Sequence, residues 1–375
     1  MAQAKVFSSG LFSATVRNDH QYFCIPAVDN PRIIIPFKNK LLFQQGLNIH
    51  NTSSFKNRIL KTLISSSFIL CKIFKRNILY GGFELKNFIK FLNQYNGYGK
   101  IEEVAVYCGT KGSINRKFTF LLLDSYGTNL GIIKYPHTKI SVNFIKNEYN
   151  QLQSLKDNNF NCLKYPSASK LITWRDKSLL YQENIFNDAS QINCDLNINI
   201  VDAAIELAKS PINSEGDINY FTKYNNLFSE YKIDLTMVDK IIKIFSNLKT
   251  VGLPIINVHG DFVPYNMQVE NNKVFIIDWE FARSGLPLYD LYHFLFQGLY
   301  QIKKYKVEKI INIIFKSSKN SKLLKYYLEE LKIDTTIMNL LFITYLLESL
   351  KFDLEIREQN NLSENHFYKA LEYIL

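Results

Sequence analysis

The 375-residue sequence lacks the marks of several protein classes. Its five cysteines are scattered and form no C-x-x-C pair, which argues against a disulfide framework or a zinc site and favours a reducing cytosol. The first residues lack the apolar core of a secretory signal, so we expect a cytoplasmic protein. No RNP, zinc or helix-turn-helix signature is present, and nucleic acid is not expected as a partner.

The sequence also has no apolar run long enough to cross a membrane. The strongest candidate lies in a predicted helix from Phe55 to Leu79, where the uncharged stretch 62–71 has only ten residues. A spanning helix needs about 20. Basic residues flank the apolar stripe of this helix, as in helices that lie on an anionic membrane surface. A helix packed on a neighbouring lobe would have the same pattern, and both interpretations stay open.

Acidic residues are scarce in the first quarter of the chain. Residues 1–100 hold 14 Lys and Arg but only 3 Asp and Glu, whereas residues 101–375 hold 31 of each kind. A basic segment attracts lipid headgroups, phosphorylated substrates or nucleic acid, although a solvated face without any partner has the same composition. An anionic membrane surface, at the inner face of the membrane, is therefore one candidate partner of the N-terminal segment.

The elements that are present change character along the chain. Short apolar runs at 21–25 and 32–36, punctuated by prolines, predict strands, and residues 83–92 predict a short helix. The sequence Asn-Gly-Tyr-Gly at 96–99 is typical of a linker, which places a domain boundary near residue 99.

Alternating strands follow this boundary and enclose a glycine-bearing loop. Glycines at 109 and 112 let backbone N–H groups approach phosphates, with Ser113 beside them, and Lys134 at a strand end can reach phosphates with its charge. Two glycines three apart also occur in ordinary turns, so the loop is a weak signal by itself. The predicted strands are 104–108, 117–123, 130–135, 169–174 and 178–181.

Helix-like apolar spacing dominates the rest of the sequence. A helix over 141–156 carries Glu148 near its middle. Further helices are predicted at 200–209, 235–248, 288–297, 306–315, 319–331 and 335–352.

The most informative stretch runs from Val258 to Glu280. An apolar lead-in delivers His-Gly-Asp, Asn266 follows Asp261 by five positions, and a second apolar run ends at Asp278. Phosphoryl transfer requires such a set, because one carboxylate aligns the attacking hydroxyl while Asn and a second Asp hold Mg²⁺ against nucleotide phosphates. We therefore predict Asp261 as the catalytic base and Asn266 and Asp278 as metal ligands.

Two departures from the protein-kinase template narrow this interpretation. Gly260 stands where that template has Arg, and Asp-Trp-Glu at 278–280 stands where it has Asp-Phe-Gly. In both respects the chain resembles the aminoglycoside phosphotransferase and choline kinase family of the protein kinase-like superfamily. The resemblance implies an α+β fold with two lobes. The predicted domains are a basic α/β extension at 1–99, a nucleotide-binding antiparallel β-sheet N-lobe at 100–185 and a helical C-lobe at 186–375.

The same resemblance assigns further residues. Glu148 would pair with Lys134, and the backbone near Glu183 and Ile185 would meet the adenine of ATP. Asp290 would support the catalytic loop, although a role as the N-cap of its own helix is equally simple. His259 is interpreted as a scaffold residue whose ring hydrogen-bonds nearby backbone.

The predicted function is an ATP- and Mg²⁺-dependent phosphotransferase that acts on a hydroxyl of a small molecule, sugar or lipid-linked glycan precursor. Family members encoded beside bacterial surface-polysaccharide enzymes carry comparable extensions, which suggests a glycan acceptor. A polycationic aminoglycoside is disfavoured because residues 101–375 have no net charge. The alternative is a non-catalytic kinase-like protein that binds nucleotide or glycan, which the retained Lys134, Asp261, Asn266 and Asp278 disfavour.

Overall fold

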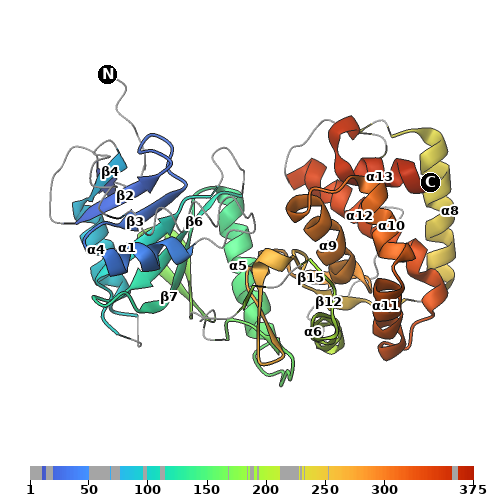
Figure 1. Cartoon of the computed structure of the whole chain (residues 1–375), viewed down its shortest axis with the longest axis horizontal. Coiled ribbons are helices and arrows are strands. Elements are labelled where there is room, and N and C mark those ends of the chain that lie inside the picture. The colour runs from blue at the N-terminus through green and yellow to red at the C-terminus, as the bar shows by residue number, and fades with distance from the viewer. Residues whose placement is uncertain are drawn as a thin grey trace. The chain divides into compact units, whose positions relative to one another are not determined.

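The computed structural model divides the chain into two compact units, which are described separately (Figure 1). Unit 1 comprises residues 1–150 and 166–187, and unit 2 comprises residues 151–165 and 188–375. The structure describes residues 11–13, 20–49, 68, 77–95, 99–109, 115–167, 169–183, 185, 190–191, 194–211, 228, 230–231, 233–251, 253–356 and 362–375.

Unit 1 is built on one nine-stranded antiparallel sheet with the order β1-β4-β2-β3-β5-β6-β7-β10-β9. Strands predicted at 117–123 and 169–174 form with those bounds, as β6 and β9. The strands are β1 Phe12–Ser13, β2 Gln21–Ile25, β3 Ile33–Pro36, β4 Ile78–Gly81, β5 Glu103–Tyr107, β6 Lys117–Leu123, β7 Asn129–Pro136, β9 Ser169–Trp174 and β10 Lys177–Gln182.

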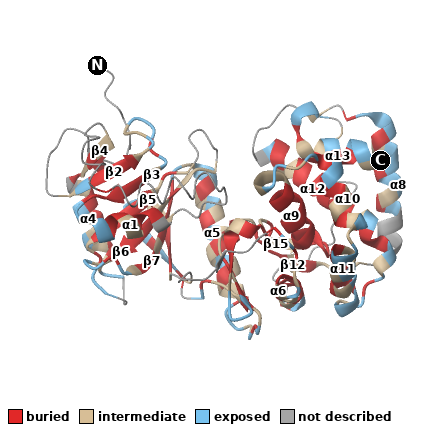
Figure 2. Cartoon of the chain, in the orientation of Figure 1, coloured by how far each residue is buried: buried red, intermediate tan, exposed pale blue. Residues whose placement is uncertain are grey.

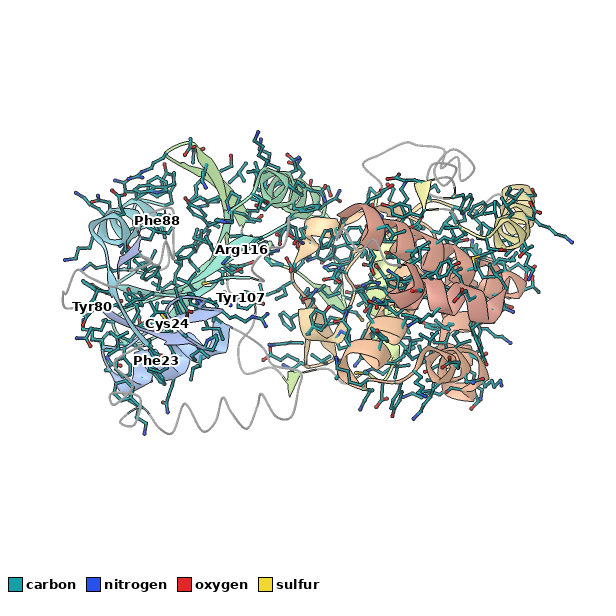
Figure 3. The ribbon with its side chains drawn as sticks, turned by 90° about the horizontal axis from the view of Figure 1, so that it is seen from above. Phe23, Cys24, Tyr80, Phe88, Tyr107 and Arg116 are labelled. Atoms are coloured by element: carbon teal, nitrogen blue, oxygen red, sulfur yellow. The ribbon has the colours of Figure 1, made fainter. Side chains whose placement is uncertain are left out.

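Hydrophobic clusters cover both faces of this sheet, because successive strand residues point to opposite sides. On β2, Cys24 joins the cluster that contains Phe88 of α4 (Phe83–Leu92), while Phe23 joins the cluster that contains Phe43 of α1 (Lys40–Gly46). Figure 3 shows Phe88 and Phe23 on opposite sides of the sheet. A strand buried on both faces needs the near-continuous apolar runs seen in the sequence.

The segment predicted as a separate extension shares this sheet. Strands β1 to β4 come from residues 12–81, and β3 pairs with β5 through Ile33 and Tyr107. The predicted boundary near residue 99 therefore lies inside unit 1, whereas the boundary near 185 lies close to its end.

The helix predicted for 55–79 falls mostly outside the described residues. Where its end is described, the prediction is wrong: Ile78 and Leu79 belong to β4, which pairs with β2. Among the described residues, no helix is both long and apolar enough to cross a bilayer.

Unit 2 is mainly helical, and the predicted α+β class with a β-rich first part and a helical second part is confirmed. Helix α9 is buried along its whole length and forms the centre of the core (Figure 2). The helices are α6 Ile198–Lys209, α8 Leu235–Val251, α9 Tyr289–Gln297, α10 Val307–Lys316, α11 Ser318–Glu330, α12 Met338–Ile356 and α13 His366–Ile374, and α5 Lys139–Ser154 runs from unit 1 into unit 2.

Two small sheets in unit 2 carry the predicted motifs. One has the order β11-β13-β14-β8 and the other pairs β12 with β15. Short 3-10 and π turns connect these elements, η3 at Pro264–Asn266, η4 at Trp279–Phe281, η5 at Gly298–Ile302 and η6 at Thr335–Ile337. The strands are β8 Leu163–Lys164, β11 Ser190–Gln191, β12 Ile256–Val258, β13 Met267–Glu270, β14 Lys273–Ile276 and β15 Arg283–Gly285.

Candidate active site

The loop that carries Asp261 begins where the buried strand β12 ends, and its shape depends on Gly260. Gly260 has φ +81°, a conformation that L side chains rarely adopt. A Cβ at this position would lie 2.3 Å from the carbonyl oxygen of Phe281. The loop therefore has room for glycine alone, which gives a physical reason for the departure from His-Arg-Asp.

Asp290 fixes the backbone of this loop from the first turn of α9. Its Oδ2 accepts a hydrogen bond from the N–H of His259 at 2.7 Å, and its Oδ1 accepts one from the N–H of Gly260 at 3.0 Å. The N-cap of α9 is Leu288, with no side-chain capping bond, so Asp290 supports the loop and does not cap its own helix. Burial raises the pKa of Asp290, although these N–H donors oppose the shift.

His259 is fully buried and joins two loops. Its Nδ1 accepts from the N–H of Asp261 at 3.3 Å, so the ring proton lies on Nε2, which donates to the carbonyl of Ile277 at 3.1 Å. Burial lowers the pKa of His259. The ring also packs edge-on against Trp279, with 4.7 Å between the ring centroids. These contacts agree with the scaffold role predicted for His259.

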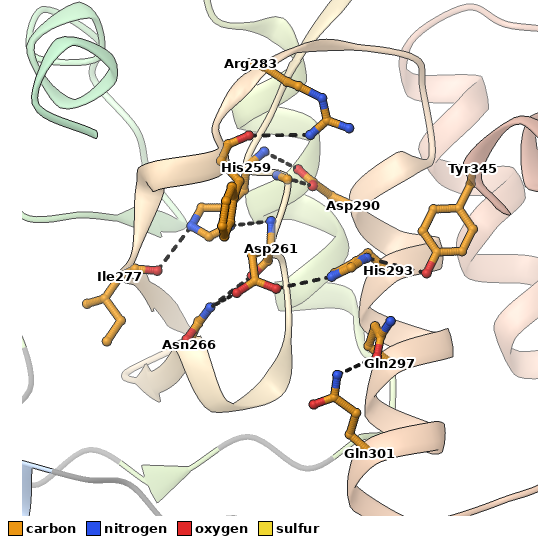
Figure 4. A network of polar contacts seen from close by, with 12 residues as sticks. His259, Asp261, Asn266, Ile277, Arg283, Asp290, His293, Gln297, Gln301 and Tyr345 are labelled. Atoms are coloured by element: carbon orange, nitrogen blue, oxygen red, sulfur yellow. Dashed lines mark hydrogen bonds and ion pairs between the residues drawn. The ribbon is translucent and has the colours of Figure 1, made fainter. Parts of the chain in front are cut away.

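The carboxylate of Asp261 is held on both sides (Figure 4). Its Oδ2 accepts from Nδ2 of Asn266 at 2.9 Å, and its Oδ1 accepts from Nε2 of His293 at 3.2 Å. Nδ1 of His293 lies 3.4 Å from the hydroxyl of Tyr345 on α12. Burial would raise the pKa of Asp261, but the hydrogen bond and charge of His293 outweigh it, and the pKa lies below its usual value.

Asn266 and Asp278 offer oxygen atoms of the kind that Mg²⁺ prefers. Because Nδ2 of Asn266 donates to Asp261, its Oδ1 remains as a neutral ligand. Asp278 follows the buried strand β14 and has φ 68°, a left-handed conformation that Asp tolerates better than most residues. In the described part of the chain no cluster of three His, Cys, Asp or Glu forms a metal site.

The turn after Asp278 is braced by its own side chains. Trp279 is 1% exposed, and its Nε1 donates to the carbonyl of Ile276 at 3.0 Å. Glu280 is buried at 5% exposure. The Asp-Trp-Glu sequence therefore anchors the carboxylate of Asp278 through a large buried ring.

In unit 1, Lys134 and Glu148 form a buried ion pair. Nζ of Lys134 lies 2.5 Å and 2.7 Å from the two carboxylate oxygens, and Nε2 of Gln182 donates to Oε1 at 3.0 Å. Lys134 is 4% exposed and Glu148 is fully buried. The pairing expected between β7 and α5 is therefore present, and Gln182 of β10 is a third member that the sequence did not indicate.

The structure describes only some of the other residues that were predicted to bind the nucleotide. Gly109 has φ +65° at the end of β5, where a Cβ would lie 3.0 Å from the carbonyl oxygen of Lys117. Glu183 accepts a hydrogen bond from Ser167 at 2.9 Å just after β10, and Ile185 is half-buried. Gly112 and Ser113 lie outside the described residues.

The sequence did not predict a role for His293, which belongs to the site. His293 lies one helical turn after Asp290, and side chains three positions apart share a helix face. This spacing was the available signal, because a helix that presents Asp290 to the loop presents His293 to the same region.

Comparisons with known proteins found a family model and similar proteins. Residues 223–303 match the model of the phosphotransferase enzyme family, a range that includes Asp261, Asn266, Asp278 and Asp290. Protein LicA of Haemophilus influenzae is 34% identical over 74 residues, which are 19% of this chain and 22% of that protein. The chain thus aligns with about a fifth of the length of this curated relative.

Solved structures show a more distant likeness. The choline kinase LicA from Streptococcus pneumoniae has 13% identity and a TM-score of 0.47, covering 77% of this chain and 97% of that one. The GDP complex of aminoglycoside 2'-phosphotransferase-IIIa has 16% identity and a TM-score of 0.49 with the same coverage. Over residues 223–303, the chain is similar to the phosphotransferase enzyme family, and the resemblance predicted from its motif is confirmed.

Proposed function

We propose that the protein is a nucleotide- and Mg²⁺-dependent phosphotransferase with a hydroxyl group as acceptor. The observation that carries the proposal is the carboxylate of Asp261, which is 16% exposed, has a lowered pKa and is oriented by Asn266 and His293 within the family-matched segment. A base that remains ionised near neutral pH can accept the proton of an attacking hydroxyl.

In this proposal the acceptor hydroxyl donates a hydrogen bond to Asp261, which aligns the acceptor oxygen with the terminal phosphate. As the bond from oxygen to phosphorus forms and the bond to the nucleoside diphosphate breaks, Asp261 takes the hydroxyl proton. Asn266 and Asp278 would hold Mg²⁺, which supplies positive charge to the phosphate oxygens. Asp290 and His259 keep the loop backbone in place.

Lys134 would contact the nucleotide phosphates. Its ammonium is oriented by Glu148, and Glu148 is in turn oriented by Gln182. Gly109, Gly112 and Ser113 would approach the phosphates through backbone N–H groups, and the backbone at Glu183 and Ile185 would meet the base. ATP is the expected nucleotide.

A neutral, hydroxyl-rich acceptor suits the side chains that follow His293. Gln297 and Gln301 continue from it at intervals of four residues, and Nε2 of Gln301 donates to Oε1 of Gln297 at 2.6 Å (Figure 4). Nε2 of Gln297 lies 3.1 Å from Nε2 of His366. Gln297 is 1% exposed and connects Gln301 and His366, which are both half-buried. The amide of Gln301 and the imidazole of His366 can donate to and accept from hydroxyls without favouring a cation, so a sugar or a lipid-linked glycan precursor is the proposed acceptor class.

The test is calorimetric titration with MgATP, comparing the wild type with Asp278→Asn. Asn tolerates the left-handed backbone of residue 278 but removes the charge, so the variant should fold and lose at least tenfold in Mg²⁺-dependent affinity. Absence of nucleotide binding by the wild type at millimolar concentration would contradict the proposal. Binding without hydrolysis or transfer to any hydroxyl compound would favour a non-catalytic nucleotide-binding protein.

A further inference from the structure

A second polar site lies in unit 1, outside the residues assigned to the nucleotide. It is an open hollow of about 690 Å³ beside α4. Its lining combines cationic and apolar side chains from the segment before β2, from α4 and from the segment before β5. The lining residues are His20, Lys86, Ile89, Lys90, Asn93, Gly99, Lys100, Ile101 and Glu102.

Positive charge in the hollow is not balanced. Lys86 and Lys90 lie on adjacent turns of α4 and are both exposed. Like charges four positions apart on a helix repel each other. In the described part of the chain neither lysine forms an ion pair, and the one lining carboxylate, Glu102, is paired with Lys100 at 2.6 Å.

A buried network orients the imidazole at the edge of the hollow. Nδ1 of His20 lies 3.1 Å from Oε1 of Glu103, whose Oε2 accepts from the hydroxyl of Tyr22 at 2.7 Å. Glu103 is 2% exposed and Tyr22 is fully buried, and burial raises the pKa of Tyr22 well above its usual value, so the hydroxyl remains a donor. This network holds the ring of His20 in a defined direction at the edge of the hollow.

The wall of the hollow is fixed to the helix. Asn93, at the end of α4, donates to the carbonyl of Ile101 at 3.0 Å and accepts from its N–H at 2.7 Å. Ile101 is 1% exposed, and Ile89 is partly buried against the sheet. Rigid walls reduce the conformational entropy that binding would otherwise cost.

We propose that this hollow binds a phosphate ester. Among the described residues, the unpaired ammonium groups of Lys86 and Lys90 and a third ammonium beside Glu102 match the double charge and the acceptor oxygens of a phosphate monoester. The half-buried side chain of Ile89 gives the organic part of the ester an apolar contact. The same chemistry is available from a soluble phosphorylated metabolite or from a lipid headgroup, and the site would account for part of the basic excess of residues 1–100.

The experiment is calorimetric titration with glycerol 3-phosphate in the presence of saturating MgADP, which occupies any nucleotide site. The double variant Lys86→Gln/Lys90→Gln should weaken binding at least tenfold. The matched control is Lys319→Gln/Lys322→Gln, which removes the same charge from exposed positions of α11 in unit 2 and should leave the affinity within twofold. Each variant's unfolding midpoint is measured first to establish that it folds.

A parallel arm separates the two sources of phosphate. Flotation with vesicles of phosphatidic acid in phosphatidylcholine, against phosphatidylcholine alone, tests the headgroup. Binding of glycerol 3-phosphate, or of the anionic vesicles, that depends on Lys86 and Lys90 but not on Lys319 and Lys322 supports the site and identifies its source. No binding of either probe, or equal loss in both double variants, overturns it. If MgADP does not bind, the proposed enzyme function fails, while the comparison of variants without nucleotide still decides this site.

Discussion

Nε2 of His293 lies 3.2 Å from Oδ1 of Asp261, across 32 positions of sequence. The contact gives the proposed base a second hydrogen bond besides that from Asn266, so both carboxylate oxygens have a defined direction. Tyr345 completes the arrangement through Nδ1 of His293, and Tyr289 stacks on the ring at 6.0 Å. His293 thus acts as a positioning residue in the proposed mechanism, because it acts through Asp261.

Replacing His293 by Ala should lower kcat by about 10- to 100-fold, because small displacements of a base cost this much. The KM for nucleotide should change less than about threefold, because the side chain of His293 contacts the catalytic carboxylate of Asp261 and not the phosphate-binding Lys134. MgATP hydrolysis in water gives the readout before the acceptor is known.

Two further variants distinguish positioning from a structural role. His293→Gln keeps an N–H donor and should recover part of kcat, whereas Tyr345→Phe removes the hydroxyl that contacts Nδ1 and should cost a few-fold. An unchanged kcat in His293→Ala, in a folded protein, would show that Asn266 alone orients the base.

Asp290→Asn tests the support of the loop. The amide keeps one acceptor oxygen, so one of the N–H groups of His259 and Gly260 loses its partner, at a cost of about 1–3 kcal/mol in unfolding free energy at pH 7. Burial raises the folded-state pKa of Asp290, so its contribution to stability is largest below the unfolded-state pKa and declines as pH rises toward the folded-state value. Urea unfolding from pH 5 upward should show the advantage of the wild type shrinking. A constant difference would mean that the carboxyl titrates alike in both states.

Gly260→Ala tests the steric requirement of the loop, with Gly127→Ala as its matched control. The two glycines have φ +81° and +79°, but a Cβ on Gly127 would meet side-chain atoms no closer than 3.1 Å, whereas one on Gly260 would meet backbone oxygen at 2.3 Å. Left-handed strain alone should cost Gly127→Ala about 1–2 kcal/mol, and Gly260→Ala should lose about 3 kcal/mol or more. Equal losses in thermal unfolding would indicate that the loop relaxes freely.

The sequence predicted local structure and local motifs well, and missed what depends on distant pairing. Strands 21–25 and 117–123 follow from apolar runs bounded by turns, and both form. The sequence did not show that residues 12–81 share a sheet with the strands that follow residue 99. The pairing of β3 with β5 joins positions some 70 residues apart and leaves no pattern in either strand alone.

The same limit applies to the candidate site. Asp261 and Asn266 are five positions apart, and the hydrogen bond between them follows from a short loop. His293 reaches Asp261 because α9 packs beside that loop, and its spacing of three residues from Asp290 indicates the shared helix face but not the contact with Asp261. Leu79 was assigned to a helix because its apolar spacing was ambiguous, and pairing of β4 with β2 decided the outcome.

The pair of Lys134 and Glu148 gives the last prediction, with Lys209 and Glu330 as the matched exposed pair. The first pair is almost completely buried. In the second pair the side chains are 49% and 43% exposed, and Nζ of Lys209 lies 2.9 Å from Oε2 of Glu330. Lys134→Met leaves a buried carboxylate that has lost its cation but still accepts a hydrogen bond from Gln182, and should cost about 3–5 kcal/mol of unfolding free energy.

Lys209→Met should cost at most about 1 kcal/mol, since exposed pairs contribute little. The double variant Lys134→Met/Glu148→Gln removes both charges and should recover part of the stability while leaving nucleotide affinity low, because the phosphate-binding ammonium is still absent. Chemical denaturation gives the stabilities and calorimetric titration with MgATP gives the affinities. Recovery of affinity in the double variant would mean that Lys134 stabilises the fold of unit 1 and does not contact the nucleotide.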